Sequence, residues 1–177
     1  DPMCGSGTIL IEGAMMVHNI APGVNRYFSA ERWDVIDEKI WADERNRARD
    51  LVNYDTDFIA YGSDIDEDAI EIAKINAKRA GVERKIKFEK ADIRNFEPKS
   101  EKGTVICNPP YGERLLDIEE AQKLYKIMGE VFKPDSENPC YVISPHEDFE
   151  RFFGKKADKK RKLYNGMIKC NLYMYFK

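Results

Sequence analysis

The sequence predicts an α/β domain with an open, mainly parallel sheet, helices on both faces of that sheet and an antiparallel hairpin at the C-terminal end. Two observations lead to this prediction. Short apolar runs alternate with segments of helical periodicity, and an acidic or polar cluster follows several of the apolar runs. Because parallel strands end at one edge of a sheet, we expect these clusters to form a ligand site there.

Length and composition fit a single domain spanning residues 1–177. The chain has 29 Lys and Arg against 32 Asp and Glu, a net charge of −3, and 42% hydrophobic residues. This mixture excludes disordered, collagen-like and coiled-coil chains. The most apolar stretch, residues 8–17, contains Glu12 and is shorter than the roughly 18 residues that cross a bilayer. We therefore expect a soluble protein without a membrane partner.

Cysteine usage indicates a reducing compartment. The four cysteines stand far apart, and with only two histidines they form no zinc-type spacing, so we expect reduced thiols and no metal site. Because the sequence shows neither a disulfide framework nor a signal segment, we expect a cytoplasmic protein. The chain starts without Met in a motif that normally follows a strand, so we expect it to be part of a longer protein.

The first third of the chain predicts two helices of different character. Good helix formers and small residues make residues 8–17 a buried helix, which Pro22 and Gly23 end. Residues 25–57 are polar, with Trp33, Ile36 and Ile40 at roughly helical spacing. We expect an amphipathic helix there, with flanking loops.

The middle of the chain predicts a strand–helix–strand unit. Residues 58–62 form a short buried strand, an acidic turn follows, and a helix over residues 67–80 presents one alanine-rich apolar face. Gly81 supplies the C-terminal stop of this helix. The next strand covers residues 86–88 and leads to Asp92.

The last third predicts two more strands, one helix and a hairpin. The strand over residues 104–107 ends in an Asn-Pro-Pro-Tyr segment. A helix over residues 119–132 and a strand over residues 140–144 follow. Residues 162–164 and 167–176 are predicted to pair around a tight turn at Asn165-Gly166, because an Asn-Gly pair readily adopts positive φ angles.

Three isolated features each allow two interpretations. Gly5 and Gly7 at the start of a helix would let a ligand approach the backbone, or would simply form a tight turn. Asp64 could accept hydrogen bonds from ribose hydroxyls, or cap the following helix. Asp92 could accept a hydrogen bond from an exocyclic amine such as that of adenine, or serve as a turn residue.

The Asn108-Pro109-Pro110-Tyr111 segment points most strongly to chemistry. Two prolines directly after a buried strand remove two backbone donors and fix an unusual path, which structure alone rarely requires. The Asn108 side-chain oxygen and the Pro109 carbonyl could accept both N–H groups of a nucleobase amine. Tyr111 could stack on a base turned out of its helix. Catalysis would consist of orientation and charge stabilisation, without a strong general base.

These motifs resemble those of class I S-adenosylmethionine-dependent methyltransferases of the amino group type. More narrowly, they are similar to the methylase domain of THUMP-containing RNA methyltransferases, including the large-subunit ribosomal RNA guanine-N2 enzymes. The resemblance covers nearly the whole chain and rests on four ordered motifs: Asp1-Pro2-Met3-Cys4-Gly5-Ser6-Gly7-Thr8, Gly62-Ser63-Asp64-Ile65-Asp66, Ala91-Asp92 and Asn108-Pro109-Pro110-Tyr111-Gly112-Glu113-Arg114. It implies a Rossmann-like class I methyltransferase fold.

The resemblance also implies roles for individual residues. Asp1 and the turn formed by Cys4, Gly5, Ser6, Gly7 and Thr8 would contact the methionine part of S-adenosylmethionine, and Asp64 its ribose. Ile65 would pack on the adenine ring, and Asp92 would bind the adenine amine. Asn108, Pro109, Pro110 and Tyr111 would hold the target base, with Asn108 also beside the cofactor.

Two departures from the family pattern stand out. The family's first strand lies upstream of Asp1, and no THUMP domain is present in these 177 residues. We expect both to belong to an N-terminal part of the protein that this chain does not include.

A basic run near the C-terminus is a candidate phosphate contact. Residues 151–162 contain seven basic side chains and one acid, and Lys159, Lys160 and Arg161 with Arg114 are the candidate nucleic-acid ligands. The leading hypothesis is methyl transfer to guanine N2 in ribosomal RNA. The alternatives are a DNA adenine-N6 methyltransferase, since the motif selects an exocyclic amine and not a base, and a catalytically silent RNA-binding or assembly module.

Overall fold

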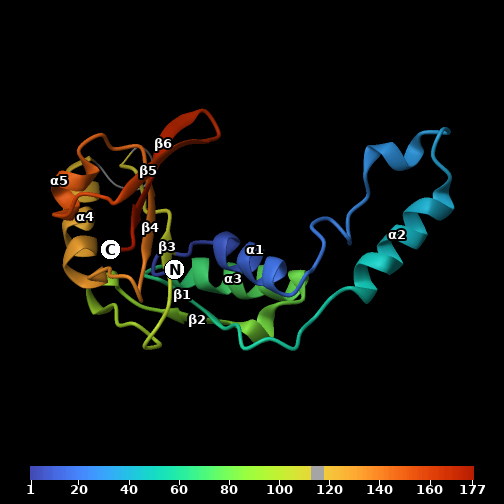
Figure 1. The fold of residues 1–177 in the computed structure, drawn as a ribbon, viewed down its shortest axis with the longest axis horizontal. Helices are drawn as coiled ribbons and strands as arrows, with labels where there is room; N and C mark the ends of the chain where they lie inside the picture. The colour runs from blue at the N-terminus through green and yellow to red at the C-terminus, as the bar shows by residue number, and fades with distance from the viewer. Residues whose placement is uncertain (113–117) are drawn as a thin grey trace.

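The computed structural model describes residues 1–112 and 118–177, and these fold into alternating helices and strands (Figure 1). The elements are, in chain order, α1 (Thr8–Val17), η1 (Ser29–Arg32), α2 (Glu38–Asp50), β1 (Ala60–Asp64), α3 (Glu67–Ala80), η2 (Glu83–Lys85), β2 (Ile86–Lys90), η3 (Ile93–Asn95), β3 (Val105–Cys107), α4 (Ile118–Phe132), β4 (Cys140–Ser144), α5 (Phe149–Phe153), β5 (Lys159–Asn165) and β6 (Ile168–Tyr175).

The strands form two sheets. β1 pairs with β2 in parallel, and the second sheet has the order β3-β4-β6-β5, in which β3 and β4 are parallel and β6 is antiparallel to both of its neighbours. The α/β class, the parallel β-α-β pairing and the C-terminal antiparallel hairpin are confirmed. The predicted single sheet is instead interrupted between β1 and β3.

A cavity of about 630 Å³ occupies this interruption. Residues of β1 and β3 line it together with Leu10 of α1 and Phe132 of α4. Among the described residues, no strand pairs with the edges of β1 and β3 that face this cavity. Asp1 lies at one end of it, where its backbone N donates to Tyr61 O and its carbonyl accepts from Ser63 N, the pattern of a parallel ladder.

Each sheet has its own hydrophobic core. α1 and α3 pack with β1 and β2, and Ala73 and Ala77 of α3 are fully buried, on the face that the sequence predicts to be apolar. α4 and α5 cover one face of the second sheet, where aromatic rings interlock. Phe149 of α5 lies 4.5 Å from Tyr173, and Phe153 lies 4.6 Å from Tyr175, measured between ring centroids. The two sub-cores position the strand ends that carry the polar clusters.

The strongest local signals gave the most accurate boundaries. The predictions for α1, α3 and β4 are confirmed to the residue. α3 begins at the cap Asp66, whose side chain accepts a hydrogen bond from Asp68 N, and ends at Gly81 with φ 75°. α1, however, ends at Val17 before reaching Pro22, since His18 already leaves the helix.

The segment between α1 and β1 differs from its prediction. Its helix, α2, starts only at Glu38, where Asp37 caps it, so Trp33 and Ile36 precede the helix and do not continue its apolar stripe. Figure 1 shows α2 projecting away from both sheets. Trp33 and Ile40 are more than half exposed, whereas Phe28 and Trp41 of the same arm stack on each other with ring centroids 5.9 Å apart.

Two features near the C-terminus also differ from prediction. The short helix α5 was not predicted, and the basic run extends into strand β5, which begins at Lys159. The hairpin loop is Gly166-Met167, not Asn165-Gly166, since Asn165 is the last residue of β5 and pairs with Ile168. Only Gly166 of this turn has a positive φ, at 61°.

Candidate active site

The glycine turn before α1 combines a packed residue with an open one. Gly7 has φ 81°, and a Cβ atom there would lie 3.1 Å from both Ala73 and Phe88, so close packing requires glycine. Gly5 has φ 51°, and the space where its Cβ would point is open. The turn is therefore both a tight structural turn and an accessible stretch of backbone.

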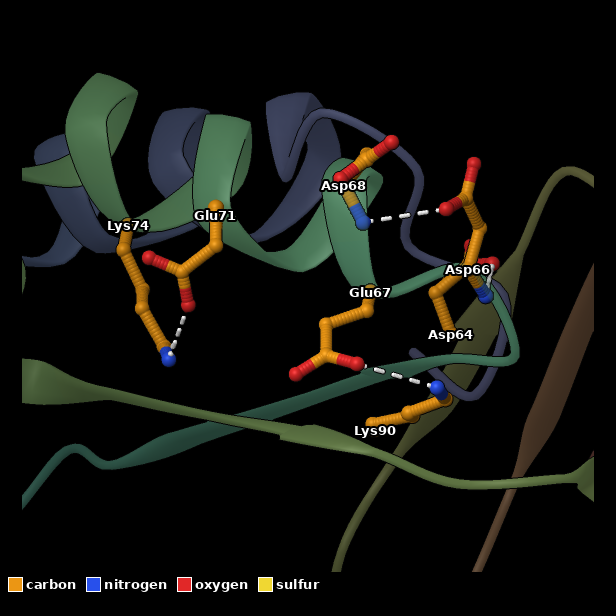
Figure 2. A network of polar contacts seen from close by, with 7 residues as sticks. All are labelled: Asp64, Asp66, Glu67, Asp68, Glu71, Lys74 and Lys90. Atoms are coloured by element: carbon orange, nitrogen blue, oxygen red, sulfur yellow. Dashed lines mark hydrogen bonds and ion pairs between the residues drawn. The ribbon is translucent and has the colours of Figure 1, made fainter.

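Asp64 connects this turn to the end of β1. Its carboxylate accepts hydrogen bonds from Gly5 N at 2.9 Å and from Asp66 N at 3.1 Å. Figure 2 shows Asp64 beside Asp66, whose own carboxylate accepts from Asp68 N at 3.0 Å. Since Asp66 is the cap of α3, the interpretation of Asp64 as that cap is wrong. Each carboxylate oxygen of Asp64 retains acceptor capacity for a ligand.

Asp92 lies at the neighbouring strand end. Ala91 N donates to the carbonyl of Asp64, which ties the ends of β1 and β2 together. The Asp92 carboxylate caps η3 through Arg94 N and also accepts from the Arg94 guanidinium, with a shortest contact of 2.5 Å. These hydrogen bonds lower the pKa of Asp92 to about 2. Asp92 is thus a cap, and it is ionised and available as an acceptor at neutral pH.

The remaining residues of the predicted cofactor set lie around these two acids. The Ile65 side chain follows directly after Asp64 and is 64% exposed. Asp1 Oδ1 accepts from Met3 N at 3.1 Å, and Ser6 is held to α3 because its carbonyl accepts from Asn76 Nδ2 at 3.1 Å. Burial raises the pKa of the Cys4 thiol to about 11, so Cys4 is a neutral packing residue.

The Asn-Pro-Pro-Tyr segment leaves the end of β3 with alternating burial. Asn108 is exposed, Pro109 is fully buried and Tyr111 is half-buried. The Tyr111 hydroxyl donates to Asn108 Oδ1, so the two polar side chains of the segment contact each other directly. The segment presents an amide and a phenol ring at the sheet edge while Pro109 anchors it.

Two buried hydroxyl groups, those of Tyr125 in α4 and Ser144 in β4, support this segment. The Tyr125 hydroxyl donates to the carbonyl of Pro110 at 3.3 Å and accepts from Ser144 Oγ at 3.3 Å. Both Tyr125 and Ser144 are fully buried. No local sequence pattern reveals this pair, because the apolar periodicity of the helix makes Tyr125 look like an ordinary core residue.

The β5–β6 hairpin supports the segment from the other side. Asn165 Nδ2 donates to the Tyr111 hydroxyl oxygen at 3.2 Å. The buried Cys170 thiol lies 3.8 Å from the same oxygen and 3.7 Å from the carbonyl oxygen of Ile168, and its one hydrogen can go to either. Asn165 was predicted only as a turn residue. Its contact with Tyr111 joins positions 54 residues apart, which no local pattern reveals.

The residues predicted to bind nucleic acid lie in different environments. Lys160 pairs with Glu150 at 2.7 Å and lies over the ring of Tyr173. Lys159 and Arg161 are exposed on the opposite face of β5, the face that also carries Asn165. Arg114 lies outside the described residues.

Three further findings concern classes of site. In residues 1–112 and 118–177, no group of three or more His, Cys, Asp or Glu side chains could hold a metal ion. The four cysteines are buried and unpaired with one another. No helix in the described part of the chain is long and apolar enough to cross a membrane.

The comparisons with known proteins all point to methyltransferases. The model of UPF0020, described as the RMKL-like methyltransferase domain, matches residues 1–174. The chain is 43% identical over 176 residues to the "Putative RNA methyltransferase YpsC" of Bacillus subtilis, covering 99% of this chain and 46% of that protein. It is 40% identical over 181 residues to the ribosomal RNA large subunit methyltransferase K/L of a Shewanella species, covering 99% of this chain and 25% of that protein.

A solved structure shares the fold closely. It is SMU.472, described as "a putative methyltransferase complexed with SAH", with a TM-score of 0.92 and 44% identity. The match covers 99% of this chain and 47% of that one. The chain thus spans less than half of the length of each of these three proteins. The structure of SMU.472, which shares the fold of this chain, contains a bound SAH molecule.

Proposed function

Since this chain belongs to the family of RMKL-like methyltransferase domains, we propose that it transfers a methyl group from S-adenosylmethionine to an exocyclic amine of an RNA base. The observation that carries the proposal is the placement of Asn108 and Tyr111 in contact with each other at the end of β3. An amide oxygen and an aromatic face at one point of a sheet edge suit a flat amine-bearing ring.

The chain's residues fit S-adenosylmethionine at the ends of β1 and β2. The open space above Gly5 admits a ligand against the backbone, Asp64 retains acceptor capacity for ribose hydroxyls, and the exposed Ile65 offers an apolar surface to an adenine ring. Asp92 would accept from the adenine amine, sharing its carboxylate with Arg94. When bound, the cofactor supplies an electrophilic methyl group.

The end of β3 would hold and orient the target. A nucleobase amine is a weak nucleophile because its lone pair is delocalised into the ring. Asn108 Oδ1 and the Pro109 carbonyl would accept its two N–H groups, which directs the lone pair and stabilises the positive charge that develops on nitrogen. Tyr111 would stack on the flipped base. The buried Tyr125 hydroxyl holds the neighbouring Pro110 carbonyl and so keeps the segment rigid.

RNA is the substrate class that the relatives and the surface favour. Two of the relatives are named as RNA methyltransferases, one of them for the large ribosomal subunit. Lys159 and Arg161 lie on the face of β5 that leads to Asn165 and the target site, where they can contact phosphates. Together with the sequence resemblance, this favours guanine N2 of ribosomal RNA.

The test is methyl transfer followed by product identification. The full-length protein would be incubated with methyl-labelled S-adenosylmethionine and, separately, with unmodified ribosomal RNA, transfer RNA and DNA, and nucleosides would be analysed by mass spectrometry. We expect labelled N2-methylguanosine from ribosomal RNA. Labelled N6-methyladenine from DNA would contradict the proposal, and cofactor binding without any label would favour a silent binding module.

We also propose that a strand preceding Asp1 in the full-length protein fills the cavity between β1 and β3. The parallel-ladder hydrogen bonds of Asp1 with Tyr61 and Ser63 would continue along β1, and the unpaired edge of β3 faces the same space. An unpaired central strand edge is costly, because its backbone groups lose hydrogen bonds. Residues 1–177 alone should therefore not melt cooperatively. A cooperative calorimetric transition of this fragment would contradict the proposal.

A further inference from the structure

The β5–β6 hairpin donates a hydrogen bond directly into the predicted base-binding segment. Asn165 Nδ2 lies 3.2 Å from the Tyr111 hydroxyl oxygen, and the Tyr111 hydroxyl in turn donates to Asn108 Oδ1. Figure 1 shows the hairpin extending beyond the sheet that carries it. A chain of two hydrogen bonds therefore runs from the hairpin to Asn108.

The direction of this chain follows from donor counting. A phenol has one hydrogen to donate and can accept through its oxygen. Because the Asn165 amide donates to the Tyr111 oxygen and Asn108 Oδ1 can only accept, the single hydroxyl hydrogen points to Asn108 Oδ1. This fixes the rotation of the Asn108 amide and leaves a second lone pair on Oδ1 for a further donor.

We propose that Asn165 is a positioning residue, which directs the Tyr111 hydrogen to Asn108 and thereby holds the Asn108 oxygen in the orientation that accepts an N–H of the target amine. This inference rests on the proposed function of Asn108. Asn165 itself does not touch the reacting atoms and acts through Tyr111.

The hairpin does not require asparagine at this position for its own geometry. Asn165 is the last residue of β5, paired with Ile168, and the positive φ of the turn belongs to Gly166. The side chain is exposed at the edge of the sheet, so it contributes little to the core. Its amide can therefore be changed without changing the turn.

The Tyr111 hydroxyl keeps its hydrogen throughout the working pH range. Burial raises the pKa of Tyr111 to about 12, above the ordinary value of a tyrosine. The donor to Asn108 is consequently present at every pH at which methyl transfer would be measured.

The test compares Asn165→Asp with Asn165→Ala in the full-length protein. A carboxylate cannot donate at neutral pH and accepts strongly, so it would draw the Tyr111 hydrogen away from Asn108. We expect kcat to fall about tenfold in Asn165→Asp and about threefold in Asn165→Ala, with the KM for S-adenosylmethionine unchanged. A merely structural role predicts the reverse order, because aspartate preserves the size of asparagine.

Two controls separate the hydrogen-bond effect from charge. Met167→Asp places the same charge on a turn residue that is 98% exposed, and should leave kcat unchanged while raising the KM for RNA as much as Asn165→Asp does. In a Tyr111→Phe background, Asn165→Asp and Asn165→Ala should have equal kcat values. Equal effects in the wild-type background, or a difference that persists in the Tyr111→Phe background, would overturn the proposal.

A readout that does not need turnover distinguishes this inference from the proposed function. If the wild-type protein methylates no RNA, the proposed function fails, and the positioning role is then decided by the side-chain amide resonance of Asn108 in ¹⁵N-labelled protein. This resonance should shift in Asn165→Asp and stay in place in Met167→Asp. An unmoved Asn108 resonance in Asn165→Asp would overturn the positioning role.

Discussion

The two ends of the candidate site hold their polar groups in different ways. At the ends of β1 and β2, the carboxylates of Asp64 and Asp92 accept hydrogen bonds from backbone N–H groups in tight turns. At the end of β3, side chains from three elements hold the segment: Tyr125 from α4, Ser144 from β4 and Asn165 from β5. The first region is acidic, and its carboxylates bind backbone N–H groups, one of them from the glycine turn 59 residues earlier in the sequence. The second region is neutral and is held by side chains.

This difference indicates that the two regions perform separable tasks. Carboxylates fixed by backbone N–H groups suit a ligand that carries hydroxyls and a positive charge. The affinity for such a ligand should depend on the carboxylates themselves. An amide, two prolines and a phenol ring suit a flat base, and their geometry depends on residues that never touch it. Substitutions at the first region should therefore change cofactor affinity, and substitutions at the second should change turnover.

The largest effect is expected at Asn108. Asn108→Ala removes the acceptor for the target amine and should lower the rate of methyl transfer by about 10²- to 10³-fold, the scale of losing one preorganised stabilising group. Single-turnover measurements at saturating cofactor and RNA would report this directly. A loss of less than about threefold would place the amine at another acceptor.

Asp64→Ala should show the complementary result. Losing a charged acceptor of ribose hydroxyls should raise the Kd for S-adenosylmethionine by about 10- to 100-fold. Asp66→Ala is the matched control, because it removes a neighbouring carboxylate that only caps α3, and should cost about 1 kcal/mol of stability without changing the Kd. Equal Kd values for the two variants would remove Asp64 from the cofactor region.

A smaller effect should follow from the buried support of the base region. Tyr125→Phe removes the hydroxyl that holds the Pro110 carbonyl, and should lower kcat about three- to tenfold while costing about 1 kcal/mol of stability. Tyr173→Phe is the matched control, since its buried hydroxyl donates to His146 O at 3.0 Å, away from the segment. The control should lose similar stability and retain kcat. A parallel loss of kcat in both variants would mean general destabilisation.

The smallest effect concerns the basic face of β5. Replacing Lys159 and Arg161 with Gln should lower the slope of log K against log salt by about 1.4, as expected for two lost phosphate contacts on a single strand, and should weaken RNA binding about threefold at roughly 0.5 M salt. Lys160→Gln should change this slope less, because Glu150 already pairs with Lys160. Filter binding over a salt series would measure the slopes of both variants. An unchanged slope in the double variant would show that the basic residues of β5 do not contact phosphates.

The sequence predicted what local signals determine. α3 has a cap, an alanine face and a stop glycine, and its bounds follow from these signals alone. The five residues of α5 depend on the packing of Phe149 and Phe153 against Tyr173 and Tyr175, so no local periodicity marks this helix. The projecting arm around α2 shows the opposite case, since Trp33 and Ile40 have roughly helical spacing in the sequence but are more than half exposed, away from both sheets (Figure 1).

The same division holds for the site. Gly5, Asp64 and Asn108 could be nominated because each follows a strand or opens a helix, and the family resemblance assigned their roles. Which acid caps α3 required the structure, because Asp64 and Asp66 are equivalent by local pattern. Asn165 and Tyr125 could not be nominated at all, because their partners lie 54 and 15 residues away and their contacts depend on how the hairpin and α4 pack.

The affinity of Asn108→Ala for S-adenosylmethionine tests the separation of the two regions most directly. Calorimetric titration of the cofactor into the full-length variant and the wild-type protein should give Kd values within about twofold of each other, since the loss of one neutral contact at the rim changes affinity little. A Kd raised as much as that of Asp64→Ala would contradict the account, because the end of β3 would then belong to the cofactor region.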